Sequence, residues 1–143
     1  MILSKKSIEQ AMENGDLTIE PFNRDSLKDA SYTFTLAPKL KVRKQPGLEY
    51  EEISIGQSGF DLPPGGFIVG FTNEKIALNG KYGCFLSNRS SCAQMGLSVL
   101  LGSDFAEPDT DGTQTLEIHN ISDNTIRLMA GMKIVKGIFM PIG

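Results

Sequence analysis

Residues 63–86 read PPGGFIVGFTNEKIALNGKYGCFL, and this stretch decides the fold class of the chain. Aromatic and β-branched residues, which favour extended strands, occupy it between groups of turn-forming residues. The turns are Pro63-Pro64-Gly65-Gly66 and Asn79-Gly80. We therefore predict three short strands here: Phe67–Thr72, Lys75–Leu78 and Tyr82–Leu86.

The same pattern continues on both sides of this stretch. Seven more strands are predicted at Ser31–Leu36, Leu40–Arg43, Glu51–Ile55, Ser98–Leu101, Gln114–Ile118, Ile126–Met129 and Lys133–Phe139. The turns between them include Gln45-Pro46-Gly47, Asp111-Gly112 and Ala130-Gly131. Many short strands with no helical periodicity between them predict a sandwich, a barrel or a jelly roll. Because the 143 residues show no repeat or linker, we expect one domain, residues 1–143.

One helix is predicted near the start, from about Ser4 to Asn14. Ser4 or Ser7 can cap it, and an apolar face recurs at helical spacing at residues 8, 11 and 12. Gly15 can adopt the left-handed backbone conformation that commonly ends a helix.

Composition excludes several classes of function. The net charge of −3 argues against a nucleic-acid binder, and no apolar stretch approaches the roughly 20 residues that cross a bilayer. The first residues lack the apolar centre of a signal peptide. Two cysteines, Cys84 and Cys92, are then expected to be free thiols in a reducing cytoplasm.

Two motifs carry candidate chemistry. The first is Arg89-Ser90-Ser91, whose hydroxyls, backbone amides and guanidinium suit phosphate oxygens, although composition alone favours a polar turn that ends a strand. The second is Glu117 on a predicted strand, where alternation puts Thr113, Thr115, Glu117 and His119 on one face. That face is either solvated or part of a polar pocket. A buried carboxylate requires a partner or a role.

The sequence does not fit the common metal sites. His119 is the one histidine and follows Glu117, which reverses the order that zinc deaminases need, and the cysteines are eight apart. The acidic turn Glu107–Gly112 resembles the start of a calcium loop, but position twelve falls on Ile118. His119 on a strand favours a structural role over a catalytic triad.

At these motifs the chain resembles the dCTP deaminase and dUTPase superfamily of trimeric all-β nucleotide hydrolases. The resemblance runs through Met1–Ser4 and Gly15–Phe22, Ala30-Ser31-Tyr32, Phe71–Leu78, Arg89-Ser90-Ser91 with Ala93 and Gly96-Leu97, and Gly131–Ile134 with Phe139. It implies a dUTPase-like β-clip, a distorted jelly-roll barrel with one N-terminal helix. Glu117 makes the chain closest to the deaminases, because dUTPases have an apolar residue there.

The resemblance also implies the roles of the site residues. Glu117 would shuttle protons for a zinc-free attack of water on dCTP, giving dUTP and ammonia, with Ser90 beside it. Arg89 and Ser91 would bind the phosphates, and Mg²⁺ would be bound through the nucleotide triphosphate. Three further positions fall among the substrate-binding residues: Gln94, Ser103 and Glu107. A homotrimer with sites between subunits is expected, for which Val135, Ile138 and Met140 are candidate interface residues.

The departures from the family pattern favour two alternatives. The family's glycine, arginine and aspartate are replaced by Asn88, Gln94 and Thr33, and the aspartate that activates water is Glu107. Thr110 replaces an aromatic residue, and a closing C-terminal tail is expected to be missing after Gly143. One alternative is therefore a degenerate member that binds a nucleotide or a protein without turnover. A dUTPase, converting dUTP to dUMP and pyrophosphate, is the less favoured one.

Overall fold

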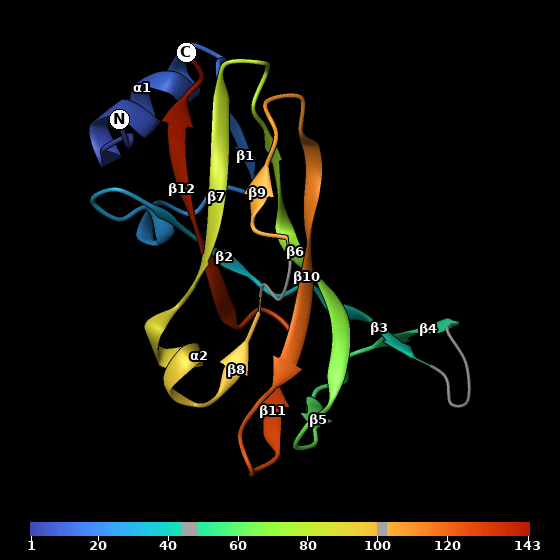
Figure 1. The fold of residues 1–143 in the computed structure, drawn as a ribbon. Coiled ribbons are helices and arrows are strands. Elements are labelled where there is room, and N and C mark those ends of the chain that lie inside the picture. The colour runs from blue at the N-terminus through green and yellow to red at the C-terminus, as the bar shows by residue number, and fades with distance from the viewer. Residues whose placement is uncertain (44–48, 100–102) are drawn as a thin grey trace.

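The computed structural model describes residues 1–43, 49–99 and 103–143, and in them the chain is mainly β (Figure 1). The helical elements are α1 (Lys5–Glu13), the 3₁₀ turn η1 (Arg24–Ser26) and α2 (Ser90–Gln94). The first strands are β1 (Thr18–Glu20), β2 (Tyr32–Thr35), β3 (Lys39–Arg43), β4 (Tyr50–Ser54), β5 (Phe60–Leu62) and β6 (Phe67–Ala77). They are followed by β7 (Tyr82–Asn88), β8 (Leu97–Ser98), β9 (Phe105–Ala106), β10 (Asp111–Asn120), β11 (Ile126–Leu128) and β12 (Lys133–Pro141).

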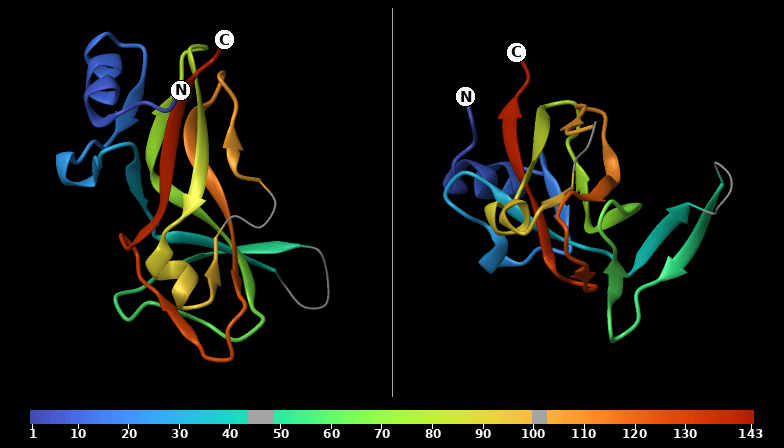
Figure 2. Two further views of the ribbon diagram at one scale, coloured as in Figure 1. Left: turned by 60° about the vertical axis from the view of Figure 1, so that its left-hand side comes forward. Right: turned by 60° about the horizontal axis from the view of Figure 1, so that its bottom comes forward.

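These strands form three sheets, which confirms the predicted mainly β fold with one N-terminal helix. The largest has the order β4-β3-β6-β10-β8, with β1 also paired to β6. The second has the order β2-β12-β7-β9, and β5 pairs with β11 in a small third sheet. Strands β3 and β4 project from the rest of the molecule, as Figures 1 and 2 both show.

One hydrophobic cluster fills the space between the sheets. Its largest fully buried side chains are Tyr32, Phe34 and Phe139. Along the strands, residues whose side chains are buried in this cluster alternate with residues that are more exposed. Burying this apolar surface is the main driving force for the fold. Cys84 and Cys92 are free thiols within this core, as predicted.

The predicted helix is confirmed as α1, where the Ser4 hydroxyl accepts a hydrogen bond from the Ser7 amide and Ile8 and Ala11 are buried. The backbone of Leu3 donates to the carbonyl of Phe139 at 2.8 Å, so the N-terminal segment lies against the end of β12. No helix among the described residues is both long and apolar enough to cross a membrane.

Three predictions about the elements were wrong. Asp111-Gly112 was predicted as a turn, but both residues pair with β6 at the start of β10. Phe67–Thr72 and Lys75–Leu78 belong to one strand, β6, because a bulge near Thr72 lets the strand continue instead of ending. The residues after Arg89 form the short helix α2, which was predicted only as a turn. The predicted turn at 45–47 and the end of the strand predicted at Ser98–Leu101 lie outside the described residues.

Candidate active site

Glu117 lies on the outer face of the largest sheet. Along β10, Leu116 and Ile118 are fully buried, whereas Glu117 and His119 are half-buried on the opposite face, so the predicted alternation is confirmed. Across the strand pair, Glu117 is opposite Val69 of β6. Lys41 of β3 is opposite the same valine from the other side. A cation, an apolar side chain and a carboxylate therefore share one row of this face.

The carboxylate of Glu117 is not fully hydrogen-bonded within the chain. Its Oε1 atom is buried, yet it has no hydrogen-bond partner among the described residues. Removing a carboxylate oxygen from water without a partner costs free energy. Lys41 does not supply that partner, since its ammonium group lies over the ring of Phe71, 5.7 Å from the centroid. Glu117 therefore retains an unused acceptor atom.

A polar recess adjoins the face that carries Glu117. It has a volume of about 230 Å³ and is lined by Leu86, Ser87, Asn88, Ser98 and Asp104. Ser98 is also the cross-strand neighbour of His119 on β10. His119 is two residues from Glu117 on the same face of β10, and neither residue lines the recess. The recess is therefore linked to the row of Glu117 only through Ser98 on the neighbouring strand β8.

Asn88, which lines this recess, joins the end of β7 to the segment around β8. It is the last residue of β7, and its side-chain amide donates to the carbonyl of Leu97 at 3.1 Å. Its Oδ1 accepts from the amide of Val99 at 3.0 Å. These two bonds hold the end of β7 against the segment that carries Ser98.

The Arg89-Ser90-Ser91 motif lies at the N-terminal end of α2. Ser90 and Ser91 are exposed, so both hydroxyls are accessible. The guanidinium of Arg89 donates through Nη1 to the carbonyl of Lys133 at 3.2 Å, which leaves most of its N–H groups for a ligand. Ser90 and Glu117 are on separate elements: α2 is followed along the chain by β8, which pairs with β10 at the edge of the largest sheet (Figure 1).

Two other predicted positions are on the surface. Ser103 and Glu107 are exposed, and the carbonyl of Glu107 accepts from the amide of Thr110 at 2.9 Å in the turn between β9 and β10.

The core thiols are poor candidates for chemistry. Burial raises the pKa of the Cys84 thiol to about 12, so it stays protonated at neutral pH. Burial also raises the pKa of Cys92, although the neighbouring Arg89 guanidinium opposes this shift. Neither thiol is a nucleophile at physiological pH.

Comparison with known proteins identifies the family of this chain. The family model described as dCTP deaminase-like matches residues 2–142. This chain is a member of the dCTP deaminase-like family. A dUMP-forming dCTP deaminase of Aquifex aeolicus (strain VF5) is 30% identical to it, over 97% of this chain and 81% of that protein.

Solved structures share the fold. The 2′-deoxycytidine 5′-triphosphate deaminase of Agrobacterium tumefaciens has a TM-score of 0.79 at 21% identity, and this chain, 99% of which is matched, covers 48% of that chain. The dUTPase of Streptococcus mutans has a TM-score of 0.60 at 18% identity, with 89% of this chain and 95% of that chain covered.

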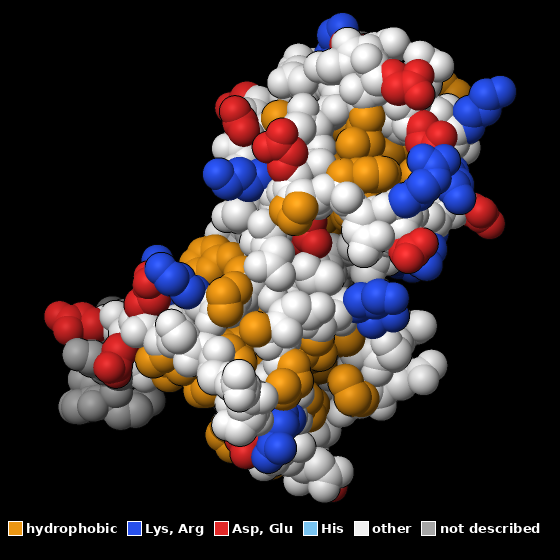
Figure 3. Space-filling model, turned by 180° about the vertical axis from the view of Figure 1, so that it is seen from behind, with side chains coloured by type: hydrophobic (Ala, Val, Ile, Leu, Met, Phe, Trp, Pro, Cys, Tyr) orange, Lys and Arg blue, Asp and Glu red, His pale blue; other side chains and the backbone are white. Residues whose placement is uncertain are grey.

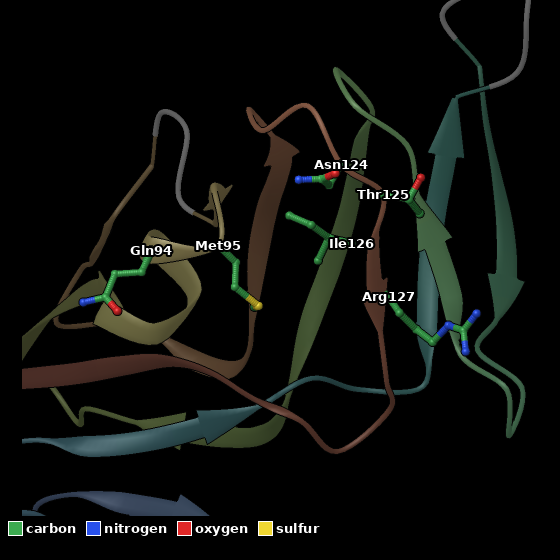
Figure 4. A pocket seen from close by; sticks show the side chains of 6 residues that line it. All are labelled: Gln94, Met95, Asn124, Thr125, Ile126 and Arg127. Carbon is green, nitrogen blue, oxygen red and sulfur yellow. The ribbon is translucent and has the colours of Figure 1, made fainter.

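In this dCTP deaminase-like chain, Gln94 is at the rim of a separate pocket. That pocket has a volume of about 420 Å³ and is lined by Gln94, Met95, Asn124, Thr125, Ile126 and Arg127. Figure 4 shows Met95 and Ile126 pointing into the space between α2 and β11, while the end of Gln94 points away from it. In the single chain, Gln94 is therefore not part of the polar recess that Asn88 lines.

Two buried polar residues of this deaminase-like fold were missed in the sequence. Asn120 is fully buried, and its amide donates to the carbonyls of Leu62 and Asn124. A signal was present, because the following Ser122 and Asn124 form an Asx-type turn with it. Thr72 is also fully buried, and no sequence pattern distinguished it from an ordinary strand threonine.

Proposed function

We propose that this protein is a dCTP deaminase-like hydrolase that converts dCTP and water to dUTP and ammonia. The observation that carries the proposal is the buried Oε1 of Glu117, which has no hydrogen-bond partner among the described residues and lies on the outer face of the largest sheet. A carboxylate in that state is suited to hold a water molecule or the base of a nucleotide.

In the proposed reaction, water attacks C4 of the cytosine ring. Glu117 accepts a proton from that water and passes it to N3 of the ring. The second water proton then moves from the new C4 hydroxyl to the exocyclic amine, the C4–N bond breaks, and ammonia leaves as the C4 carbonyl forms. No residue forms a covalent bond to the substrate. The unused acceptor atom of Glu117 fits this shuttle, because the water supplies the hydrogen bond that Oε1 lacks within the chain.

The triphosphate is proposed to bind at the start of α2. The exposed hydroxyls of Ser90 and Ser91 and the remaining N–H groups of Arg89 are suited to phosphate oxygens. Mg²⁺ enters with the nucleotide as part of the substrate. Ser103 and Glu107, both exposed, are proposed as further contacts with the substrate. Gln94 is proposed as another contact, from its position at the rim of the separate pocket.

A homotrimer of the domain 1–143, with sites between subunits, is proposed as the working form. Large apolar side chains stay exposed in the single chain: Phe85 is 40% exposed, Met95 48% and Ile121 66%. Apolar groups also cover a broad area of the face seen from behind (Figure 3). Of the candidate interface residues, Ile138 and Met140 are partly exposed, whereas Val135 is fully buried in the core and is explained by packing alone. Surfaces of this kind mark protein contacts.

The test is turnover by the purified protein. MgdCTP is incubated with the wild type, Glu117→Ala and Glu117→Gln, and ammonia and nucleotides are measured by a coupled assay and by chromatography. We expect ammonia in equal amount to lost dCTP, and at least about a hundredfold less in both variants. The nucleotide peak also separates dUTP from dUMP, the product named for the Aquifex relative. Equal ammonia release by the wild type and Glu117→Ala would refute the proposal.

A second function, nucleotide or protein binding without turnover, is favoured by position 94. A neutral glutamine there, with its side chain directed away from its pocket, supplies no cation to a substrate. Calorimetry with dCTP and dTTP distinguishes the two functions: binding without ammonia release supports the second one. Pyrophosphate release from dUTP, measured in parallel, would instead indicate a dUTPase.

A further inference from the structure

The strand pair that carries Glu117 contains a β-bulge. Thr113 is opposite Lys75, but two residues later Thr115 is opposite Phe71. Three residues of β6, Thr72 to Glu74, therefore face the single residue Gln114 of β10. Bulges are common beside active sites, where they redirect a strand.

The hydroxyl of Thr72 replaces the missing ladder bond at this bulge. It accepts a hydrogen bond from the amide of Gln114 at 2.9 Å and donates to the carbonyl of Glu74 at 2.8 Å. The Thr72 side chain is fully buried. Without the hydroxyl, both of these backbone groups would lose their partner in the interior.

The other edge of the bulge is fixed by the chain that crosses from β2 to β3. The carboxylate of Glu74 accepts from the amide of Thr35 at 2.9 Å and from its hydroxyl at 2.8 Å. The amide of Asn73 donates to the carbonyl of Leu36 at 3.0 Å. The bulge is thus held from both sides, and Thr72 is the one of its three side chains that bonds to β10.

Glu117 follows Gln114 by three residues, so the bulge sets its position along the sheet. If β10 slipped by two residues to remove the bulge, Glu117 would keep its face but move about 7 Å along the strand. Strand alternation decides that Glu117 points outward, and the bulge decides that it stands opposite Val69.

We propose that Thr72 is a positioning residue for the deamination reaction, acting through Gln114 to hold Glu117 at its place on the outer face. This inference rests on the proposed function. Displacing a catalytic group by about 1 Å can lower a rate a hundredfold, so loss of the Thr72 hydroxyl should reduce kcat. KM should change little, because the phosphate-binding motif is on α2 and not on this strand pair.

Two matched pairs isolate the hydroxyl. Thr72→Val replaces it by a methyl group of similar size, and Thr72→Ala differs from Thr72→Ser by the hydroxyl alone. Thr33→Val is the control, since Thr33 is also buried on a strand and its hydroxyl makes no hydrogen bond within the described residues. Each variant is measured for kcat and KM with MgdCTP. Backbone hydrogen exchange is followed in residues 114–120 and in residues 89–96.

We expect Thr72→Val and Thr72→Ala to lose about tenfold or more in kcat with KM within about twofold. Exchange should become about tenfold faster in 114–120 and stay unchanged in 89–96. Thr72→Ser and Thr33→Val should match the wild type. If Thr72→Val unfolds, the alanine and serine pair decides.

Unchanged kcat in the variants without the hydroxyl, or an equal loss in Thr72→Ser, would overturn the proposal. A wild type that releases no ammonia refutes the proposed function instead. In that case exchange alone decides the role of Thr72: unaltered protection of residues 114–120 in Thr72→Val overturns it.

Discussion

Replacing Asn120 by alanine should be among the most destabilising single changes in this protein. Its side chain makes four hydrogen bonds: the amide donates to the carbonyls of Leu62 at 3.0 Å and Asn124 at 2.8 Å, and Oδ1 accepts from the amide and the hydroxyl of Ser122 at 2.9 and 2.8 Å. Each bond contributes about 1 kcal/mol to the free energy of unfolding. The loop around residues 121–124 can regain some of this from water, which leaves about 3 kcal/mol.

That loss should lower the melting temperature by roughly 6–12 °C for a chain of this size. Urea unfolding followed by circular dichroism gives the free energy, and a thermal scan gives the midpoint. Asn124→Ala is the matched control, because its exposed amide makes one long contact of 3.4 Å, to Asp123. The reasoning fails if Asn120→Ala loses less than about 1 kcal/mol, or if both alanine variants lose the same amount.

The loop held by Asn120 also supports α2. The amide of Ile121 donates to the carbonyl of Gly96 at 2.8 Å. A methyl group on Gly96 would come within 2.6 Å of Ser122. The Asn120→Ala variant should therefore show faster hydrogen exchange in residues 90–96 as well as in the loop. Unchanged exchange in α2 would show that the loop held by Asn120 does not stabilise this helix.

Three further outcomes follow from the packing. The pKa of the Cys84 thiol is about 12 in the folded state, so the thiol ionises more easily in the unfolded chain. The free energy of unfolding should therefore fall by about 1.4 kcal/mol per pH unit between about pH 9 and 12. Urea titrations at several pH values should show that Cys84→Ala lacks this dependence on pH. Gly137→Ala places a methyl group 2.5 Å from Phe34 and should cost about 1–3 kcal/mol, whereas Gly56→Ala, with no atom within 4 Å, should be neutral; equal melting temperatures would contradict this. Asn88→Gly removes the two side-chain hydrogen bonds to Leu97 and Val99, so hydrogen exchange in residues 97–99 should become about tenfold faster. Unchanged exchange there, measured by mass spectrometry, would mean that these two bonds do not hold the segment.

Sequence patterns predicted the fold where local signals and burial agree. The alternation along residues 113–119 placed Glu117 and His119 on one face, and Ser4 was identified as the start of α1. Both depend on short-range periodicity, which is visible in a single sequence. The residues beside Glu117 were less predictable, because Val69 and Lys41 reach it through strand pairings that are distant along the chain.

The bulge in β6 shows the same limit. Residues 72–75, which include polar side chains, read as a break between two strands, and only the partners of those side chains explain why the strand continues. Thr72 bonds to β10, whereas Glu74 bonds to Thr35, the last residue of β2 in another sheet. No local rule reports such partners, since they are brought together by the tertiary fold.

The position of β12 has a consequence for how the protein is made. It is a central strand of its sheet, between β2 and β7, and its residue Phe139 receives the bond from Leu3. During translation the strands that flank it emerge first and wait with unpaired edges, and the N-terminal segment has nothing to dock on. The four-stranded sheet can therefore be completed only after β12 has left the ribosome. A product that terminates before residue 133 would present open strand edges to chaperones and proteases.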